Sequence, residues 1–456
     1  MNKKEFYQNI KKIAVPITVQ SLLQAALSLI DQIMIGNLGS ASIAGVGLAA
    51  KFISLFTVTM TAIVTVAGIL IAQYKGNKSK EGINNSFFCN LYFSLTVAIV
   101  FIILSLVLPR QIMGLYSKDS ATIEQASIYL RIMAIGFIPQ TVTLMFSALL
   151  RNMELAKAAT VASGVSVLTN TILNYLFIFG VGIFPKMNVA GAALATSLSR
   201  IIELGIIIVL FLKSKDEKGI ELKFVFTFGK DFIKKIGYVL VPILLCEFLW
   251  SLGENVYAII YGHIGTEACA AMTLTYPIQT IAIGALSGVS ASAGIIIGES
   301  LGAGKNDKAY EEAVRFMKMT VAAAVVLGII ISLLAGYYVK LYNVSPETRN
   351  VTIYILYAYS LVFCGKVVNM VLGGGVLRSG GQTKYIMLID LIGTWLIGVP
   401  LGIITAYVLK LPIYYVYFIL SLEEYVRVLL GVKVFKSRRW MKNIAESDFV
   451  SAKTVS

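Results

Sequence analysis

Long apolar stretches separated by short polar breaks recur along the whole chain. Each stretch has more than 20 residues and, at 1.5 Å per helical residue, is long enough to cross a hydrocarbon layer about 30 Å thick. Backbone groups in lipid must be hydrogen-bonded within their own segment, so each stretch is expected to be a helix. The twelve predicted spans are 13–35, 44–73, 87–108, 124–150, 158–183, 189–212, 238–261, 269–300, 313–339, 348–377, 384–408 and 412–434.

The sequence repeats itself at half its length. Residues 16–76 align without a gap with residues 242–302, at a shift of 226 positions. A half-length repeat in an apolar chain is typical of membrane transporters, whose binding site lies between the two copies. Function is therefore expected at the interface of the halves. The matched pairs include Pro16 with Pro242, Gly36 with Gly262, Gly39 with Gly265, Leu48 with Leu274, Gly68 with Gly294 and Gly76 with Gly302.

The longest charged connection divides the chain where the first copy ends. Each half then holds six predicted helices, and this even number gives both copies the same orientation in the membrane. The predicted fold is an all-α polytopic membrane protein of two six-helix lobes, related by a pseudo-two-fold axis along the membrane normal. The expected divisions are an N-lobe at 1–212, a cytoplasmic linker at 213–237, a C-lobe at 238–434 and a cytoplasmic tail at 435–456.

Composition and charge agree with this assignment to lipid. Hydrophobic residues make up 57% of the 456, and only 14% are charged, which leaves too little polar surface for a globule in water. The net charge of +15 reflects topology rather than nucleic-acid binding, because 29 of the 39 lysines and arginines lie in the termini and the even-numbered connections. By the positive-inside rule both termini are predicted to be cytoplasmic.

A polar set in the first half is suited to a cation. Asp31 is the only acid in the first span, and a carboxyl at mid-bilayer needs a partner, a cavity or a function. Asn170 and Asn174 are four residues apart and so share one helix face, and Thr196 supplies a hydroxyl from the next span. A carboxylate, two amide oxygens and a hydroxyl form a hard oxygen set for Na⁺, whereas the carboxyl alone would bind H⁺.

The second half has different polar residues. Glu247 and Glu254 are two turns apart on one helix face, with Trp250 on nearly the same side, and this acidic aromatic wall would attract an organic cation. Lys366 is expected to pair with Glu247, and Asp390 is the other candidate partner, because a buried ammonium is cheaper beside a carboxylate.

Other chemistry finds little support in the sequence. The single histidine, His263, lies in a short connection, and neither a Walker loop, nor HExxH, nor a GxSxG elbow occurs. The four cysteines lack metal or redox spacing. An enzyme or an ATP-driven pump is therefore not expected, and neither is a cofactor beyond a coupling ion.

At this point the chain resembles the MATE family of multidrug and toxic compound extrusion transporters, and in particular bacterial NorM-like members, over all twelve spans. The resemblance rests on VPITVQ…LIDQIMIGNLG and VPILLCE…VYAIIYGHIG, on the loops LLRNMELAK and VLRSGGQTK, and on NTILNYLFIFG followed by GAALATSLSR. It implies a secondary antiporter, a monomer in the bacterial plasma (inner) membrane, that exports small amphipathic, often cationic compounds in exchange for Na⁺ or H⁺.

The resemblance also implies roles for residues. Asp31, Asn170, Asn174 and Thr196 match the family's N-lobe cation site, and relatives often have a second aspartate where Asn174 stands, so Na⁺ and H⁺ both remain open. Separately from the resemblance, a bend of the first helix at Pro16 is expected to distinguish the two arrangements between which an ion at Asp31 selects.

In the second half, Glu247 matches the acid typical of helix seven in the branch with a C-lobe cation site. The second acid of that branch stands in helix ten, where this chain has Lys366 and Asn369 instead. We therefore expect the cation in the N-lobe, and Glu247, Trp250, Glu254, Lys366 and Asn369 around a substrate cavity.

The predicted mechanism is a rocker switch in which a cation at Asp31 shifts the population between two arrangements of the first helix. The alternative is a flippase for lipid-linked oligosaccharide precursors, from a related superfamily. A flippase of that kind needs cationic residues to hold a pyrophosphate, and Lys366 and Arg200 would have to supply them.

Overall fold

The structure is a computed structural model that describes residues 3–35, 38, 40–216, 219–342 and 344–445. The repeat positions Gly36 and Gly39 lie outside the described residues, as does the part of the expected tail after Ala445. The chain forms two compact units. Unit 1 comprises Met1–Ile71 and Ser79–Lys234, and unit 2 comprises Ala72–Lys78 and Lys235–Ser456.

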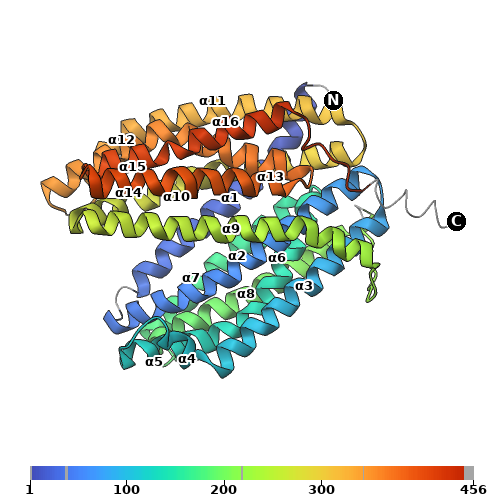
Figure 1. Cartoon of the computed structure of the whole chain (residues 1–456). Helices are drawn as coiled ribbons and strands as arrows, with labels where there is room; N and C mark the ends of the chain where they lie inside the picture. Colours follow the sequence, from blue (N-terminus) through green and yellow to red (C-terminus); the bar gives the residue numbers. More distant parts are fainter. Residues whose placement is uncertain (1–2, 36–37, 39, 217–218, 343, 446–456) are drawn as a thin grey trace. The chain divides into compact units, whose positions relative to one another are not determined.

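Unit 1 is built from the blue to green helices of Figure 1, in which α7 packs along both α1 and α8. Its elements are α1 (Lys3–Ile35), the greater part of α2 (Ser40–Gly76), α3 (Lys80–Val107), α4 (Pro109–Gly114), α5 (Ser120–Met133), the 3₁₀ turn η1 (Ala134–Gly136), α6 (Phe137–Asn152), α7 (Ala156–Phe179) and α8 (Asn188–Ser214).

Unit 2 contains the end of α2 and the yellow-green to red helices of Figure 1, three of whose segments, η2, η3 and η4, are π-helical. Its further elements are α9 (Lys230–Ile264), α10 (Thr266–Gly302), α11 (Asn306–Val339), α12 (Pro346–Asn369), η2 (Met370–Leu377), α13 (Thr383–Asp390), η3 (Leu391–Gly398), α14 (Val399–Ile403), η4 (Ile404–Val408), α15 (Ile413–Ser421) and α16 (Glu423–Lys436).

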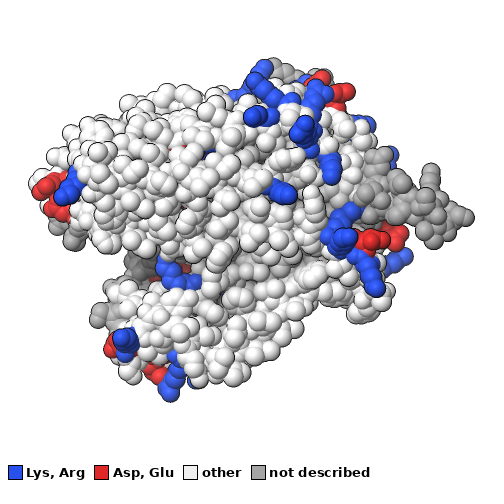
Figure 2. Space-filling model, in the orientation of Figure 1, with Lys and Arg blue, Asp and Glu red and all other residues white. Residues whose placement is uncertain are grey.

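Eleven helices of the described chain are long and apolar enough to cross a membrane, and they fall on the first eleven predicted spans. Many large apolar side chains on their outer surfaces are exposed, as expected where lipid replaces water. Figure 2 shows the flanks of the unit 2 helices almost free of charge, whereas Lys and Arg gather over the start of α11 and the end of α16. The prediction of an all-helical polytopic membrane protein is confirmed.

The twelfth predicted span, 412–434, is divided between α15 and α16. Leu422 separates them but keeps a helical backbone, with φ −62° and ψ −17°. The amides of Leu422 and Tyr425 bond to carbonyls three residues back instead of four, which is the pattern of a 3₁₀ turn. The span is therefore a helical rod with one tightened turn, and its second half carries the charged residues described below.

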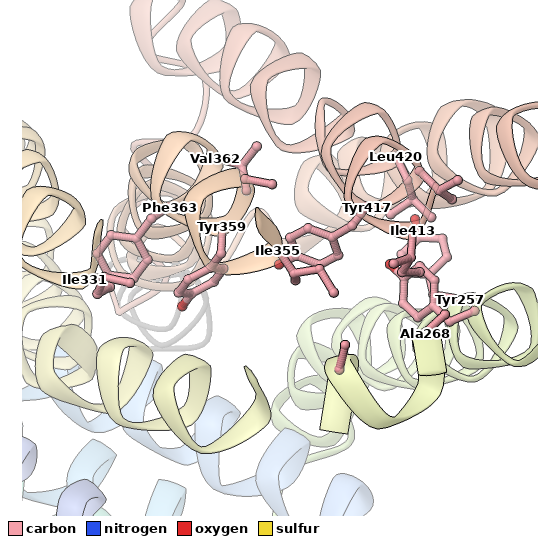
Figure 3. Close-up of a cluster of buried hydrophobic side chains, with 14 of the residues drawn as sticks. Tyr257, Ala268, Ile331, Ile355, Tyr359, Val362, Phe363, Ile413, Tyr417 and Leu420 are labelled. Carbon is pink, nitrogen blue, oxygen red and sulfur yellow. The ribbon is translucent and has the colours of Figure 1, made fainter. Parts of the chain in front are cut away.

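The core of unit 2 is a cluster of buried aromatic and aliphatic side chains from α9, α10, α11, α12 and α15 (Figure 3). Tyr359 and Phe363, one turn apart on α12, have ring centroids 5.4 Å from each other. Tyr261 of α9 and Tyr417 of α15 lie 6.3 Å apart at the other end of the cluster. These rings fix α12 against its neighbours.

Two glycines related by the repeat let α2 and α10 cross closely inside unit 2. A Cβ on Gly76 would overlap the carbonyl oxygen of Glu299, and a Cβ on Gly302 would overlap the carbonyl oxygen of Gln73. Gln73 and Glu299 are themselves separated by the 226-residue shift. The crossing is thus reciprocal, and each backbone packs against the other where a side chain would prevent it.

The segment after α16 packs on this crossing. Trp440 is fully buried, and its ring stacks on Phe435, with centroids 5.8 Å apart. The side-chain amide of Gln73 donates to the carbonyl oxygens of Ser379 at 2.7 Å and Lys442 at 3.0 Å, and its oxygen accepts the amide of Ile444 at 2.6 Å. The first part of the predicted tail is therefore part of the C-terminal unit's core.

We predict that Gly302→Ala destabilises the protein by about 1–3 kcal/mol, because the new methyl group forces the two backbones apart. The measurement is the melting temperature in detergent, followed by size-exclusion chromatography after heating. Gly336→Ala is the matched control, since its Cβ points into open space on α11 and should leave the melting temperature unchanged or raise it. Equal melting temperatures for Gly302→Ala and the native protein would contradict a tight crossing.

Candidate functional site

The four residues of the predicted N-lobe set lie together in unit 1. The side-chain amide of Asn174 donates to the Asp31 carboxylate at 2.6 Å and to the Asn170 side-chain oxygen at 2.8 Å. The amide of Asn170 donates in turn to the Thr196 hydroxyl at 3.2 Å. A continuous chain of hydrogen bonds thus joins α1, α7 and α8.

Helix geometry explains why these residues meet. Asn170 and Asn174 are one turn apart on α7, and both side chains are 1% exposed because that face packs between α1 and α8. Buried amides need hydrogen-bond partners, and the carboxylate and the hydroxyl on the flanking helices supply them. The i, i+4 spacing on α7 therefore sets the register of the whole cluster.

A cavity of about 200 Å³ opens beside this cluster within unit 1. It brings one carboxylate together with hydroxyl and amide groups from four helices, and it is large enough for a hydrated monovalent ion. Its lining residues are Ser28, Asp31, Ile35, Val46, Tyr129, Asn174, Ala192 and Thr196.

The donor set fits a small hard cation or a proton. The side-chain oxygen of Asn174 is buried and accepts no hydrogen bond from any residue that the structure describes. A buried amide oxygen without a donor costs free energy, and a cation would satisfy it. Asp31, Asn174 and Thr196 face the cavity, so they would hold the ion, and Asn170 would orient Asn174.

Pro16 lies inside α1, which runs without interruption from Lys3 to Ile35. Proline has no amide hydrogen to donate, so the helix is weakened by one backbone bond at this position. The carbonyl oxygen of Pro16 accepts a hydrogen bond from the Thr160 hydroxyl of α7 at 2.8 Å. A bend of α1 at Pro16 would therefore move or break a hydrogen bond to α7, the helix that carries Asn170 and Asn174.

In unit 2, the expected pair between Lys366 and Glu247 is wrong. Glu247 of α9 instead lies 3.0 Å from the guanidinium of Arg378, which begins the connection after η2. Arg378 also contacts the sulfur of Cys246 at 3.7 Å. Arg378 directly follows the predicted span 348–377, so the sequence places it in a connection, but its side chain is largely buried and neutralises Glu247.

Lys366 and Asn369 bind a different acid. The Lys366 ammonium lies 3.4 Å from the Glu424 carboxylate of α16, and the Asn369 side-chain amide donates to the same carboxylate at 3.0 Å. Trp250 and Glu254 remain on an exposed side of α9. Of the expected acidic aromatic wall, only these two side chains are therefore open to a ligand.

A buried charge cluster centred on Arg427 was missed by the sequence analysis. Arg427 is 4% exposed and lies 3.2 Å from Glu423, 3.7 Å from Asp390 and 3.8 Å from Glu424. In the sequence Arg427 is one of the 29 lysines and arginines that predict the cytoplasmic side. The i, i+3 and i, i+4 spacing of these two glutamates from Arg427 could have indicated the cluster.

Glycines in the π-helical region make room for these charges. A Cβ on Gly393 would overlap the Arg427 side chain, and a Cβ on Gly398 would overlap both Glu423 and the Tyr257 hydroxyl. That hydroxyl donates to the Glu423 carboxylate at 2.6 Å. The glycines of this segment therefore make room for long polar side chains as well as for close helix packing.

We predict that Arg427→Leu destabilises the protein by about 3–5 kcal/mol, because it leaves three carboxylates buried without their shared cation. The measurement is the melting temperature in detergent. Arg110→Ala is the control: its ion pair with Glu124 is largely exposed, so the loss should not exceed about 1 kcal/mol. Similar shifts for both variants would show that the Arg427 cluster contributes no more than a surface pair.

Comparison with known proteins agrees with the geometry. The MatE family model matches residues 16–176 and 242–404, one block in each half. The chain is 24% identical over 434 residues to the uncharacterized transporter YisQ of Bacillus subtilis, covering 94% of this chain and 93% of that protein. It is 25% identical over 394 residues to a probable multidrug resistance protein NorM of Photorhabdus laumondii, covering 86% of each.

Solved structures show the same fold. One is titled as the outward-facing conformation of a multidrug resistance MATE family transporter of the MOP superfamily. It superposes with a TM-score of 0.86 at 19% identity, over 94% of this chain and 96% of that one. The fold and the doubled sequence define a polytopic membrane transporter. The chain belongs to the MATE family, whose members are ion-coupled transporters and not enzymes.

Proposed function

We propose that this transporter is a secondary antiporter that exports small amphipathic, cationic organic compounds in exchange for Na⁺ or H⁺. The observation that carries the proposal is the Asp31, Asn174, Asn170 and Thr196 chain beside its cavity. The probable multidrug resistance proteins among its relatives support an organic substrate. The proposed location is the bacterial plasma membrane, with a monomeric chain and both termini in the cytoplasm.

Coupling requires the ion to distinguish two conformations. Neutralising or ligating Asp31 changes the charge that Asn174 holds, and this changes how α1 packs on α7. An ion with equal affinity for both arrangements would shift neither, so the proposed rocker switch depends on a different Asp31 environment in each state. Each positive charge that moves inward contributes about 2.3 kcal/mol of driving free energy per 100 mV of membrane potential.

The C-lobe supplies the attraction for a cationic substrate. Glu247 is neutralised by Arg378, so the acid of the expected acidic aromatic wall that stays exposed is Glu254, one turn from Trp250. A carboxylate beside an indole ring attracts an organic cation through charge and through the ring's negative face. We therefore assign substrate attraction to Glu254 and Trp250, with Glu247 as a paired structural group.

A lipid-linked oligosaccharide flippase fits this arrangement less well. Such a protein needs cationic side chains that can receive a pyrophosphate. Of the two expected residues, Lys366 lies 3.4 Å from the Glu424 carboxylate, and Arg200 lies near the carboxyls of Glu203 and Asp31, whose charges act on it. Arg378 and Arg427 also lie within 3.2 Å of a carboxylate. Removing any of them from its partner would leave a buried acid unpaired, which is costly.

We predict that Asp31→Asn abolishes uphill export while leaving the melting temperature nearly unchanged. Asparagine keeps the shape of the side chain but can neither release a proton nor ligate Na⁺ with a charge. The measurement is efflux of a fluorescent organic cation from sealed vesicles under an imposed Na⁺ gradient and then under a pH gradient. The gradient that drives Asp31-dependent efflux identifies the ion.

Asp307→Asn is the control for that experiment, since Asp307 lies at the exposed start of α11 and the change should leave export intact. Full uphill export by Asp31→Asn would remove this carboxyl from the coupling mechanism.

We predict that Glu254→Gln weakens binding of a fluorescent monovalent organic cation by about tenfold, equivalent to about 1.4 kcal/mol. The reason is the loss of the exposed carboxylate beside Trp250. Binding is measured by fluorescence polarisation with purified protein, and Glu267→Gln at the exposed start of α10 is the control. Unchanged affinity in Glu254→Gln would place the substrate elsewhere.

A further inference from the structure

The connection between α8 and α9 contains a row of aromatic side chains that the transport mechanism does not use. We name residues 219–229 the strap. It runs from Gly219 to Gly229 without helix, and every second residue between them is apolar: Ile220, Leu222, Phe224, Phe226 and Phe228. This alternation places the apolar side chains on one side of an extended segment.

The strap is bound to the outside of α3. The Asn84 side chain exchanges two hydrogen bonds with the backbone of Lys223, each 2.8 Å long. Farther along, the ring of Phe224 lies 5.2 Å from Phe88, and that of Phe226 lies 6.2 Å from Tyr92. The strap therefore follows α3 from its first turns towards the middle of the helix.

Despite these contacts, the strap's central rings are open. Phe224 is 78% exposed and Phe226 is 80% exposed, whereas Ile220 at the start of the strap is buried. The two exposed rings stack at 6.4 Å with planes 11° apart, so they form one flat apolar surface. Two fully solvated phenylalanines would be unfavourable in water, and this surface continues the lipid-facing side of a membrane-spanning helix.

The neighbours on α3 indicate the depth of the strap. The sequence of α3 is mainly polar up to Ser86 and mainly apolar from Phe87 onward. Lys223 lies at the level of Asn84, in the polar part, and the exposed rings lie at the levels of Phe88 and Tyr92, in the first turns of the apolar part. Aromatic rings and lysines at such a boundary are typical of a membrane interface.

The charge around the strap is positive. Residues 213–235 contain seven lysines against four acids. Glu221 is shared by Lys80 at 2.7 Å and Lys223 at 3.9 Å, and its hydrogen bond with Lys80 holds the pKa of its carboxyl below the usual range. Two lysines face one carboxylate here, which leaves an excess of one formal positive charge at this point. Lysines beside a membrane surface attract anionic headgroups.

We propose that the strap is an anchor for anionic phospholipid: Phe224 and Phe226 enter the lipid monolayer, and the exposed lysines beside them bind the headgroups. The occupant is lipid because the rings continue the lipid-facing surface of α3, and it is anionic because of the lysine excess. The connection between the two halves is therefore held at the membrane by lipid as well as by α3.

The test replaces Phe226 with the photoreactive residue p-benzoylphenylalanine in the full chain, reconstituted in nanodiscs with equal amounts of phosphatidylglycerol and phosphatidylcholine. After irradiation, adducts are identified by mass spectrometry. We expect lipid adducts at position 226, with phosphatidylglycerol several-fold over phosphatidylcholine. The same residue at Phe363, which is fully buried in the core of unit 2, is the control and should yield intramolecular products.

Charge is tested separately. Lys223→Gln and Lys230→Gln should each reduce the phosphatidylglycerol preference by about fivefold while lipid adducts persist. Equal adducts from the two lipids in the native chain would overturn the anionic specificity. Adducts only to a second copy of the chain, or none to lipid, would overturn the anchor itself.

Discussion

A charged side chain inside a bilayer costs roughly 2.5–3.5 kcal/mol on permissive scales, and the arrangement of both units follows from this cost. In unit 1 the hydrogen-bond partners of the acid are neutral: Asn174 donates to Asp31 and to Asn170, and Asn170 donates to Thr196. Unit 2 meets this cost with opposite charges around Arg427. The Asp31 carboxylate has a neutral hydrogen-bond partner, and the charge of Arg200 acts on it without forming an ion pair. Such a carboxyl can take up and release a cation, whereas a carboxylate in direct contact with arginine is committed to the fold. This difference is the physical reason for assigning the ion to the N-lobe.

The repeat also relates two arginines that contact the first helix of each half. Arg151 and Arg378 are related by a shift of 227, and each reaches the first helix of its own half at matching places. Arg151 donates to Gln20 at 2.7 Å, and Arg378 contacts Cys246, which is the repeat partner of Gln20. Both copies thus keep a contact between this arginine and the first helix of the half. The next residue differs between the copies: Glu247 pairs with Arg378, but a serine stands at the matching position 21.

Much of the fold and half of the candidate site could be predicted from the sequence. Span lengths follow from hydropathy alone, and the i, i+4 spacing of Asn170 and Asn174 placed them on one face beside Asp31. The partners of Lys366 and Glu247, and the contact of Arg427 with Asp390, could not be predicted, because they depend on how neighbouring helices are rotated about their axes. Arg378 and Arg427 lie near span ends, where their charges are also expected from the topology of the chain. From the sequence, the strap is predicted only as part of a charged linker. Its alternating aromatic residues are not recognised as a surface because many lysines lie beside them.

The hydrogen bonds of Gln73 have a consequence for biosynthesis. Its partners Ser379, Lys442 and Ile444 lie 306, 369 and 371 residues farther along the chain. The end of α2 therefore leaves the ribosome long before the partners of the buried Gln73 side chain have been synthesised. The last of these hydrogen bonds can form only after Ile444 has been made. Completion of this contact requires that synthesis has passed Ile444. A chain that stops before Lys442 would keep an unsatisfied polar group at that helix end, a feature by which quality-control proteases could distinguish it from a chain that has made the contact.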